Sequence, residues 1–122
     1  MSSKEILKNW SQYFNDANLS RILNLYDKES ILIPTFSGQS LSGHKKIRGY
    51  FHKVLIDQKV SVETNFASVF EEKLCKNLYL LSGNYIFIFG EKKKISARFT
   101  FLINLLSDNP IKHHHSSSMP IN

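Results

Sequence analysis

The sequence predicts an α+β fold, in which N-terminal helices pack on a curved antiparallel sheet and together form a cone. Apolar residues recur with the 3.6-residue period of a helix early in the chain, and with a period of two after residue 60. The later segments follow one another with short turns, as in an antiparallel meander. The 122 residues, 42% of them hydrophobic, suffice for one core, so a single domain over residues 1–122 is expected.

Three helices are expected before residue 60, because apolar residues there recur on one face of the helical period. Ser2 begins the first helix with Glu5 three residues later, which is the spacing of a capping box. The second helix is short and begins at Leu19. The third is capped by Ser42 and extends to Leu55.

Five strands are expected, each an apolar run or an alternation of apolar and polar residues. They cover residues 30–33, 60–70, 78–89, 95–106 and 111–118. Pro34 limits the first strand to an edge or an end of the sheet, because proline lacks an amide donor. Gly83 predicts a bend or bulge in the third strand. Turns are expected at residues 71–73, 90–94 and 107–110.

The last expected strand contains three consecutive histidines followed by three serines. A purification tag is usually longer and runs to the end of a chain, whereas these histidines continue a strand-like segment. Side chains alternate between the two faces of a strand, so His113 and His115 share one face and His114 takes the other. His114 is expected to pack rather than to take part in chemistry.

A turn that pairs Leu106 with Ile111 would set the register of the last two strands. Directly opposed residues share a face, so one face would carry Arg98, Thr100, Asn104, His113, His115 and Ser117. The other face would carry Phe99, Phe101, Ile103 and His114. An arginine and two histidines on the concave face would form a cationic pocket for a carboxylate or another small anion. A shift of one residue would instead pair the aromatic face with the outer histidines.

Each candidate binding residue also has a purely structural interpretation. Arg98 could be a surface arginine, and His113 and His115 could be hydrogen-bonded histidines of a core or an interface. Tyr85 on the middle strand could line the same pocket or fill the core. The sequence leaves these alternatives open.

His113 and His115 are the candidate general bases if the pocket is catalytic. Glu63 is the only one of the ten acidic residues that lies well inside an expected strand. Binding is favoured over catalysis, because the pattern supplies no acid deep in the cone. No metal is expected, because a catalytic zinc site takes three protein ligands and the His-x-His pair supplies two.

Other classes of protein are disfavoured by composition. The net charge of +6 does not indicate nucleic-acid binding, because the lysines are dispersed and do not alternate with aromatic residues. The run Lys92–Lys94 is expected to lie in a solvated hairpin turn. No segment has the apolar length of a signal peptide or a membrane span, so a soluble, cytoplasmic protein without membrane partners is expected. Cys75 is the single cysteine, which excludes an intramolecular disulfide.

Several segments in chain order resemble one family within the nuclear transport factor 2-like superfamily. This family is the bacterial relatives of the calcium/calmodulin-dependent protein kinase II association (hub) domain. The tail 113–120 (HHHSSSMP) resembles the closing strand of that family, and residues 97–101 (ARFTF) resemble the strand before it. Residues 82–87 and 32–37 resemble two further strands of the family, and Ile47 with Tyr50 and Phe51 resembles its third helix.

The resemblance implies a cone-shaped fold, assembly into dimers or larger rings, and a pocket in which arginine holds small carboxylates. Arg98 would be that arginine, with His113 and His115 beside it. No cofactor is implied. No kinase motif is present, so no kinase activity is expected.

The sequence therefore predicts a module that binds a small anion and forms homo-oligomers, with Arg98, His113, His115, Tyr85, Thr100 and Ser117 as ligand-binding residues. A homodimer would form through the outer face of the sheet, with Phe99, Phe101 and Ile103 as its apolar surface. One alternative is an isomerase, dehydratase or hydrolase with His113 or His115 as the base. Another is a structural hub whose pocket has no ligand.

Overall fold

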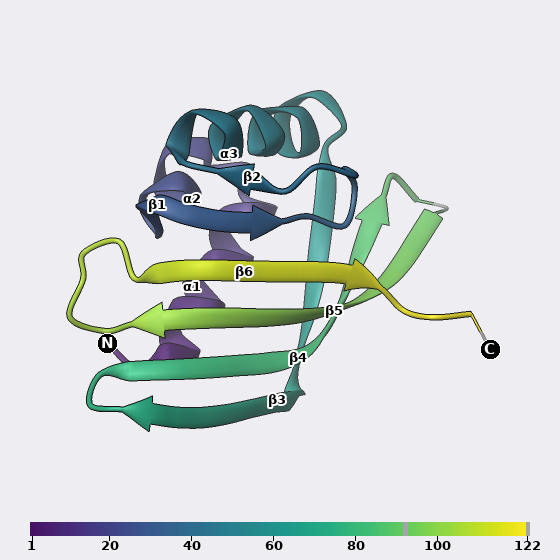
Figure 1. Ribbon diagram of the computed structural model, residues 1–122. Coiled ribbons are helices and arrows are strands. Elements are labelled where there is room, and N and C mark those ends of the chain that lie inside the picture. The colour runs from purple at the N-terminus through teal and green to yellow at the C-terminus, as the bar shows by residue number, and fades with distance from the viewer. Residues whose placement is uncertain (92, 122) are drawn as a thin grey trace.

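A computed structural model describes residues 1–91 and 93–121 (Figure 1). Lys92 of the expected hairpin turn and Asn122 at the end of the tail lie outside the described residues. The helices are α1 (Ser3–Asn15), α2 (Leu19–Asn24), α3 (His44–Phe51) and the π-helix η1 (His52–Asp57). The strands are β1 (Tyr26–Ile33), β2 (Leu41–Ser42), β3 (Val60–Cys75), β4 (Leu78–Phe89), β5 (Lys93–Asn104) and β6 (Ile111–Ser118).

The predicted α+β class is confirmed: helices pack on one face of a six-stranded sheet with the order β2-β1-β6-β5-β4-β3. The meander from β3 to β6 is antiparallel throughout. β1 pairs parallel with β6 and so lies inside the sheet, with β2 on its other side. Pro34 follows directly after the last residue of β1, which is the end position that its missing amide donor allows.

The N-terminus of α1 has the predicted capping box. Ser2 Oγ accepts a hydrogen bond from the Glu5 amide, and the Glu5 carboxylate accepts one from the Ser2 amide, each at 3.2 Å. These bonds satisfy amide donors that the first helical turn leaves unpaired. The buried face of α1, which includes Trp10 and Phe14, packs on the sheet.

β1 begins at Tyr26 rather than at residue 30, and β5 covers Lys93–Asn104 rather than residues 95–106. Three further differences from the prediction concern a helix cap, a turn and a bulge. Ser42 belongs to β2, and Gly43, with a φ of +87°, precedes α3 in its place. β3 does not turn at residues 71–73 but continues to Cys75, and the turn contains Asn77 with a φ of +67°. The bulge expected from Gly83 occurs in the neighbouring strand, between Asn65 and Phe70 of β3. Asparagine and glycine tolerate the left-handed region of backbone conformation better than serine or glutamate does. This preference explains why the helix cap lies at Gly43 and the turn at Asn77.

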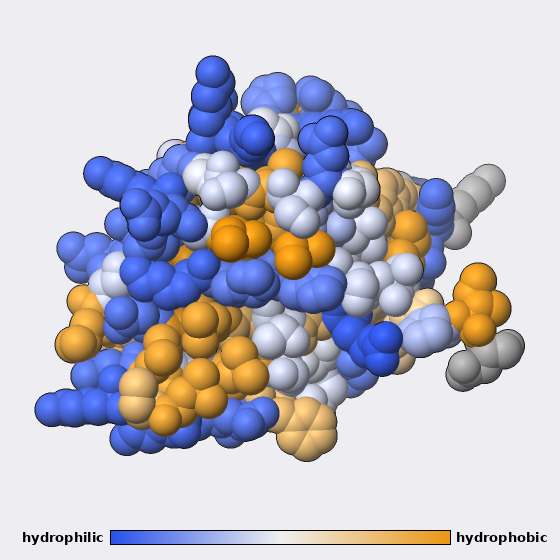
Figure 2. All heavy atoms as spheres, in the orientation of Figure 1, coloured by the Kyte–Doolittle hydropathy of each residue, from blue (hydrophilic) through white to orange (hydrophobic). Residues whose placement is uncertain are grey.

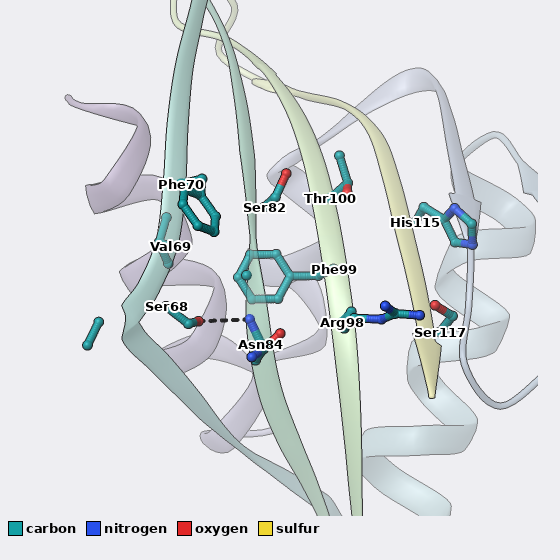
Figure 3. A pocket seen from close by; sticks show the side chains of 12 residues that line it. Ser68, Val69, Phe70, Ser82, Asn84, Arg98, Phe99, Thr100, His115 and Ser117 are labelled. Atoms are coloured by element: carbon teal, nitrogen blue, oxygen red, sulfur yellow. Dashed lines mark hydrogen bonds between the residues drawn. The ribbon is translucent and has the colours of Figure 1, made fainter. Parts of the chain in front are cut away.

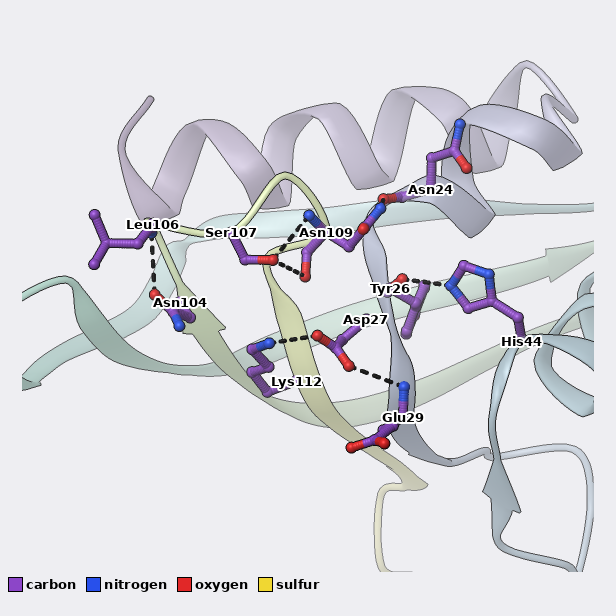
Figure 4. Close-up of polar contacts among 10 residues, drawn as sticks. All are labelled: Asn24, Tyr26, Asp27, Glu29, His44, Asn104, Leu106, Ser107, Asn109 and Lys112. Carbon is purple, nitrogen blue, oxygen red and sulfur yellow. Dashed lines mark hydrogen bonds and ion pairs between the residues drawn. The ribbon is translucent and has the colours of Figure 1, made fainter.

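The loop between β5 and β6 sets their register (Figure 4). Asn104 Oδ1 accepts from the Leu106 amide at 3.0 Å, and the Asn109 side-chain amide donates to the Asn24 carbonyl at 2.6 Å. The predicted Leu106–Ile111 pairing is therefore wrong, and Ile111 pairs with Ile103.

Beyond a bulge, the register pairs Leu102 with His113, Thr100 with His115 and Arg98 with Ser117. This register differs from the predicted one by two residues. A shift of two leaves unchanged which side chains share a face, so the two predicted sets of residues stay together.

The assignment of the two faces is reversed, however. Phe99, Phe101 and Ile103 are each at most 2% exposed and belong to the core beneath the helices, so they cannot supply a dimer surface. Burying a large apolar side chain stabilises the folded state by about 1.5–3 kcal/mol. Packing α1 on this face therefore stabilises the fold. Arg98 and His115 lie on the opposite face, away from α1, and are exposed. In the described ranges 1–91 and 93–121, no helix is both long and apolar enough to cross a bilayer.

Candidate functional site

The face of the sheet that points away from α1, here called the outer face, carries side chains in rows across neighbouring strands. Each row follows from the strand register and the alternation of side chains. The rows are Glu72–Leu80–Leu102–His113, Phe70–Ser82–Thr100–His115, Asn65–Asn84–Arg98–Ser117 and Glu63–Ile86–Ser96. The two middle rows are polar apart from Phe70, whereas the first row contains two leucines.

A hollow of about 550 Å³ lies over the middle rows (Figure 3). Its polar lining comes from Ser68, Ser82, Asn84, Arg98, Thr100, His115 and Ser117. Residues 67–70, around the β3 bulge, form one wall of the hollow. The Ser68 hydroxyl accepts a hydrogen bond from the backbone amide of Asn84 at 2.9 Å. The bulge is possible because Gly83 has no side chain: a Cβ there would lie 2.9 Å from Phe99 Cζ and 3.0 Å from Ser68 Oγ.

The structure brings four of the six predicted ligand-binding residues to this hollow: Arg98, Thr100, His115 and Ser117. His113 shares their face but lies one row away and does not line the hollow. Tyr85 projects to the other side of the sheet, where it is 1% exposed. Arg98 lies opposite Asn84 on the outer face, and Tyr85 is the next residue of β4. Successive side chains of a strand alternate between the two faces, so Tyr85 cannot share a site with Arg98.

Arg98 is the fixed positive charge of the hollow. Figure 3 shows its side chain extending along the sheet toward Ser117 on β6. Among the described residues, no carboxylate lies within 4.0 Å of its guanidinium group. A guanidinium group offers parallel N–H donors that match the two oxygens of a carboxylate, and the hydroxyls of Thr100 and Ser117 add further donors.

On the other side of the sheet, the interior of the cone contains a continuous chain of buried hydrogen bonds. Trp10 Nε1 donates to Tyr26 Oη at 3.0 Å, and Tyr26 Oη lies 2.7 Å from His114 Nδ1. His114 Nε2 lies 3.1 Å from Tyr85 Oη, which donates to Ser116 Oγ at 2.5 Å. All of these side chains are at most 4% exposed.

The directions in this chain follow from its two ends. Tyr85 donates its proton to Ser116, so it can only accept at His114, and Nε2 of the imidazole carries the proton. The Tyr26 oxygen accepts from the indole N–H of Trp10, and its own proton is directed to Nδ1 of His114. The imidazole is therefore neutral with both nitrogens in use, and neither nitrogen is free to act as a base toward a ligand.

Burial sets the protonation states of this chain. Desolvation is the main cause that lowers the pKa of His114 well below 6.5, with His113 and His115 as smaller contributors. Desolvation likewise raises the pKa of Tyr26 and of Tyr85 above the usual value for tyrosine. The cavity beside His114 measures only about 10 Å³, the volume of a single water at most. The space beside His114 is therefore too small for a ligand, whereas the hollow around Arg98 lies open on the other face of the sheet.

Sequence reasoning missed this interior chain. The alternation of side chains along the last strand predicted that His114 points to the other face from His113. It did not predict a hydrogen-bond partner for the His114 imidazole. Tyr26 reaches His114 because β1 pairs parallel with β6, where Tyr26 lies opposite Ile111, three residues before His114. A parallel contact between segments so far apart in the chain leaves no local sequence signal.

No group of three or more histidine, cysteine, aspartate or glutamate side chains within the described residues is arranged to hold a metal ion. The hollow around Arg98 contains one histidine and no carboxylate in its lining. Its donors suit an anion rather than a cation.

No sequence-family model matches this chain, and no curated protein matches it in sequence. Solved structures do match. A Xanthomonas campestris protein, provisionally assigned as a calcium/calmodulin dependent protein kinase II association domain, superposes with a TM-score of 0.83 at 25% identity, over 95% of this chain and 84% of its own.

A protein of unknown function from Pseudomonas putida KT2440, described as NTF2-like, gives a TM-score of 0.81 at 14% identity, over 98% of this chain and 84% of its own. A Novosphingobium aromaticivorans protein, provisionally assigned as a scytalone dehydratase, gives 0.78 at 5% identity, over 96% and 81%. The neighbours thus include both an enzyme assignment and proteins of unknown function, so the fold does not select one activity. The chain has the nuclear transport factor 2-like fold, and a protein provisionally assigned as an association domain is among the structures that it resembles.

Proposed function

We propose that the protein binds small carboxylates in the outer-face hollow and assembles into a homo-oligomer through an adjacent apolar patch. The observation that carries the first part is the Arg98 guanidinium group, which faces a hydroxyl-lined hollow without an acidic partner among the described residues. A guanidinium group without a counterion in a concave site attracts an anion from solution. The assignment of the Xanthomonas campestris neighbour as an association domain supports the second part.

The hollow favours a carboxylate over a larger polyanion. It offers one fixed cation, with His115 as the only other titratable group in its lining. Its wall also contains Val69 and Phe70, which can cover the hydrocarbon part of a small acid. A monocarboxylate with a short apolar chain satisfies both features.

Isothermal titration with caproate, a short-chain carboxylate, tests this proposal. Arg98→Gln should weaken binding by about tenfold or more, because a charge-assisted hydrogen-bond pair is lost. Arg48→Gln, which removes an exposed arginine from α3, serves as the matched control and should bind as the wild type does. Equal affinity in all three proteins would contradict the proposal.

The apolar patch consists of Leu78, Leu80 and Leu102. Leu80 and Leu102 oppose each other on β4 and β5, and Leu78 follows on the same face. Figure 2 shows orange side chains gathered over this end of the sheet, beside the polar middle rows. The three side chains are half-buried, and an apolar patch that a sheet leaves partly uncovered is a natural contact for a second copy of the chain.

Light scattering coupled to size exclusion tests the assembly. Leu80→Glu should reduce the mass of the particle, because a buried charge at the contact is costly. Leu106→Glu is the control, since Leu106 is 77% exposed in the β5–β6 loop, outside the patch. A monomeric wild type, or an unchanged mass in Leu80→Glu, would contradict assembly through this patch.

A catalytic function would depend on His115, because His113 lies outside the hollow and His114 is fully hydrogen-bonded. His115 could act as a base on a carboxylate substrate held by Arg98. Turnover that disappears in His115→Gln while caproate affinity persists would support this second candidate.

A further inference from the structure

The outer face carries a second hollow next to the first. It measures about 400 Å³ and is lined by Glu63, Asn65, Ser96 and Met119, among others. Asn84 lines both hollows, so they adjoin at this side chain. The two adjoining hollows are together called the trough here.

The two halves of the trough carry opposite charges. Arg98 lines the first hollow and Glu63 lines the second, and both side chains are exposed. Within the described residues, neither has an ion-pair partner within 4.0 Å, and they do not pair with each other. Each charge is therefore available to a ligand, and the amide of Asn84 lies between them.

The strand register sets the spacing of these charges. Arg98 pairs with Asn84, whereas Glu63 pairs with Ile86, so the two residues are separated by two strand spacings and one row. Standard sheet dimensions place their Cα atoms about 12 Å apart. Their long side chains can lean inward, so a ligand several bonds long can reach both groups, whereas an α-amino acid is too short.

We propose that the trough binds a linear zwitterion, an ω-amino carboxylate or a short peptide of similar length. Arg98 receives the carboxylate and Glu63 receives the ammonium group. The polar side chains of Asn65, Asn84 and Ser96 line the path between them. This inference rests on the proposed function, because it uses the same carboxylate site, and it adds a determinant for the other end of the ligand.

Titration calorimetry with ε-aminocaproate and caproate tests the proposal, because these acids differ only in the terminal ammonium group. The wild type should bind ε-aminocaproate about threefold to fivefold more tightly, which is the effect of an exposed ion pair. Glu63→Gln should abolish this preference and leave the caproate affinity unchanged. Glu72→Gln is the matched control, since Glu72 is an exposed carboxylate of the same strand that lines neither hollow, and it should keep the preference.

The possible failures are distinguishable. If the wild type binds both acids equally, or if the preference survives in Glu63→Gln, the zwitterion proposal is overturned while the carboxylate site stands. If neither acid binds the wild type, both proposals fail. Equal thermal unfolding midpoints of the wild type and Glu63→Gln would show that the fold is intact, as expected for a change at an exposed side chain.

Discussion

Lowering the pH should destabilise the protein through His114. The pKa of this buried imidazole is lowered well below 6.5, mainly by desolvation, whereas in the unfolded chain it keeps its ordinary value. Below pH 6.5 the unfolded state therefore binds a proton that the folded state does not. The stabilising contribution is fully present above pH 6.5 and is lost as the pH falls toward the folded-state pKa.

The expected magnitude follows from proton linkage. A single proton of difference gives a slope of about 1.4 kcal/mol per pH unit. With the folded imidazole still neutral at pH 5, the loss between pH 8 and pH 5 is about 2 kcal/mol. The hydrogen bonds explain why the folded state resists the proton: Tyr26 already directs its hydroxyl proton at Nδ1, so a protonated Nδ1 would face another donor.

Urea unfolding at several pH values between 5 and 8 measures this slope. His114→Gln should flatten the dependence by about 1.4 kcal/mol per pH unit below pH 6, whatever its own stability. His113→Gln, which removes a partly exposed imidazole from the same strand, should retain most of the slope. An identical slope in the wild type and His114→Gln would refute the reasoning.

Three further substitutions test the packing around these sites, each by urea unfolding at pH 8. Tyr26→Phe leaves the Trp10 indole and His114 Nδ1 without partners and should cost about 2–4 kcal/mol, whereas Tyr79→Phe should be near neutral; a loss below about 1 kcal/mol would contradict the chain. Gly83→Ala places a Cβ 2.9 Å from the ring of Phe99 and should cost about 1–3 kcal/mol, so an unchanged midpoint would show that the ring moves freely. Ser30→Ala removes a buried hydroxyl that has no partner among the described residues, and it should be neutral or stabilising by up to about 1 kcal/mol; a clear loss would reveal a missed partner.

Much of the fold was predictable because it is encoded in local periodicity. The alternation in the second half of the chain defines strands, and Ser2 with Glu5 defines the start of α1. The grouping of Arg98, His115 and Ser117 was also predictable, because a register error of two residues leaves faces unchanged.

The orientation of those faces was not predictable from one strand alone. Both faces of β5 and β6 contain plausible pocket residues, and the helices decide which face is covered. Burying the aromatic side chains of Phe99 and Phe101 stabilises the fold more than burying the polar face would. For this reason α1 covers the aromatic face. Because α1 covers the aromatic face, Arg98 lies on the outer face. His114, which was expected only to pack, is therefore the imidazole in the interior.

The bonds of His114 were beyond sequence reasoning for a different reason. Its partners Tyr26 and Tyr85 come from β1 and β4, which do not neighbour each other in the sheet. Their meeting depends on the curvature of the whole sheet around α1. Such non-local contacts follow from the assembled fold rather than from any single segment.

Amide chemical-shift mapping with caproate tests the central claim most directly, because it locates the ligand. Binding in the outer-face hollow should shift the amides of Arg98, Thr100 and Ser117 and leave the indole N–H of Trp10 unmoved. Trp10 is the single tryptophan and lies in the interior chain, so its indole signal is an unambiguous reporter of the other side of the sheet. A shift of the Trp10 indole without shifts at Arg98 and Ser117 would place the ligand inside the cone and contradict the account.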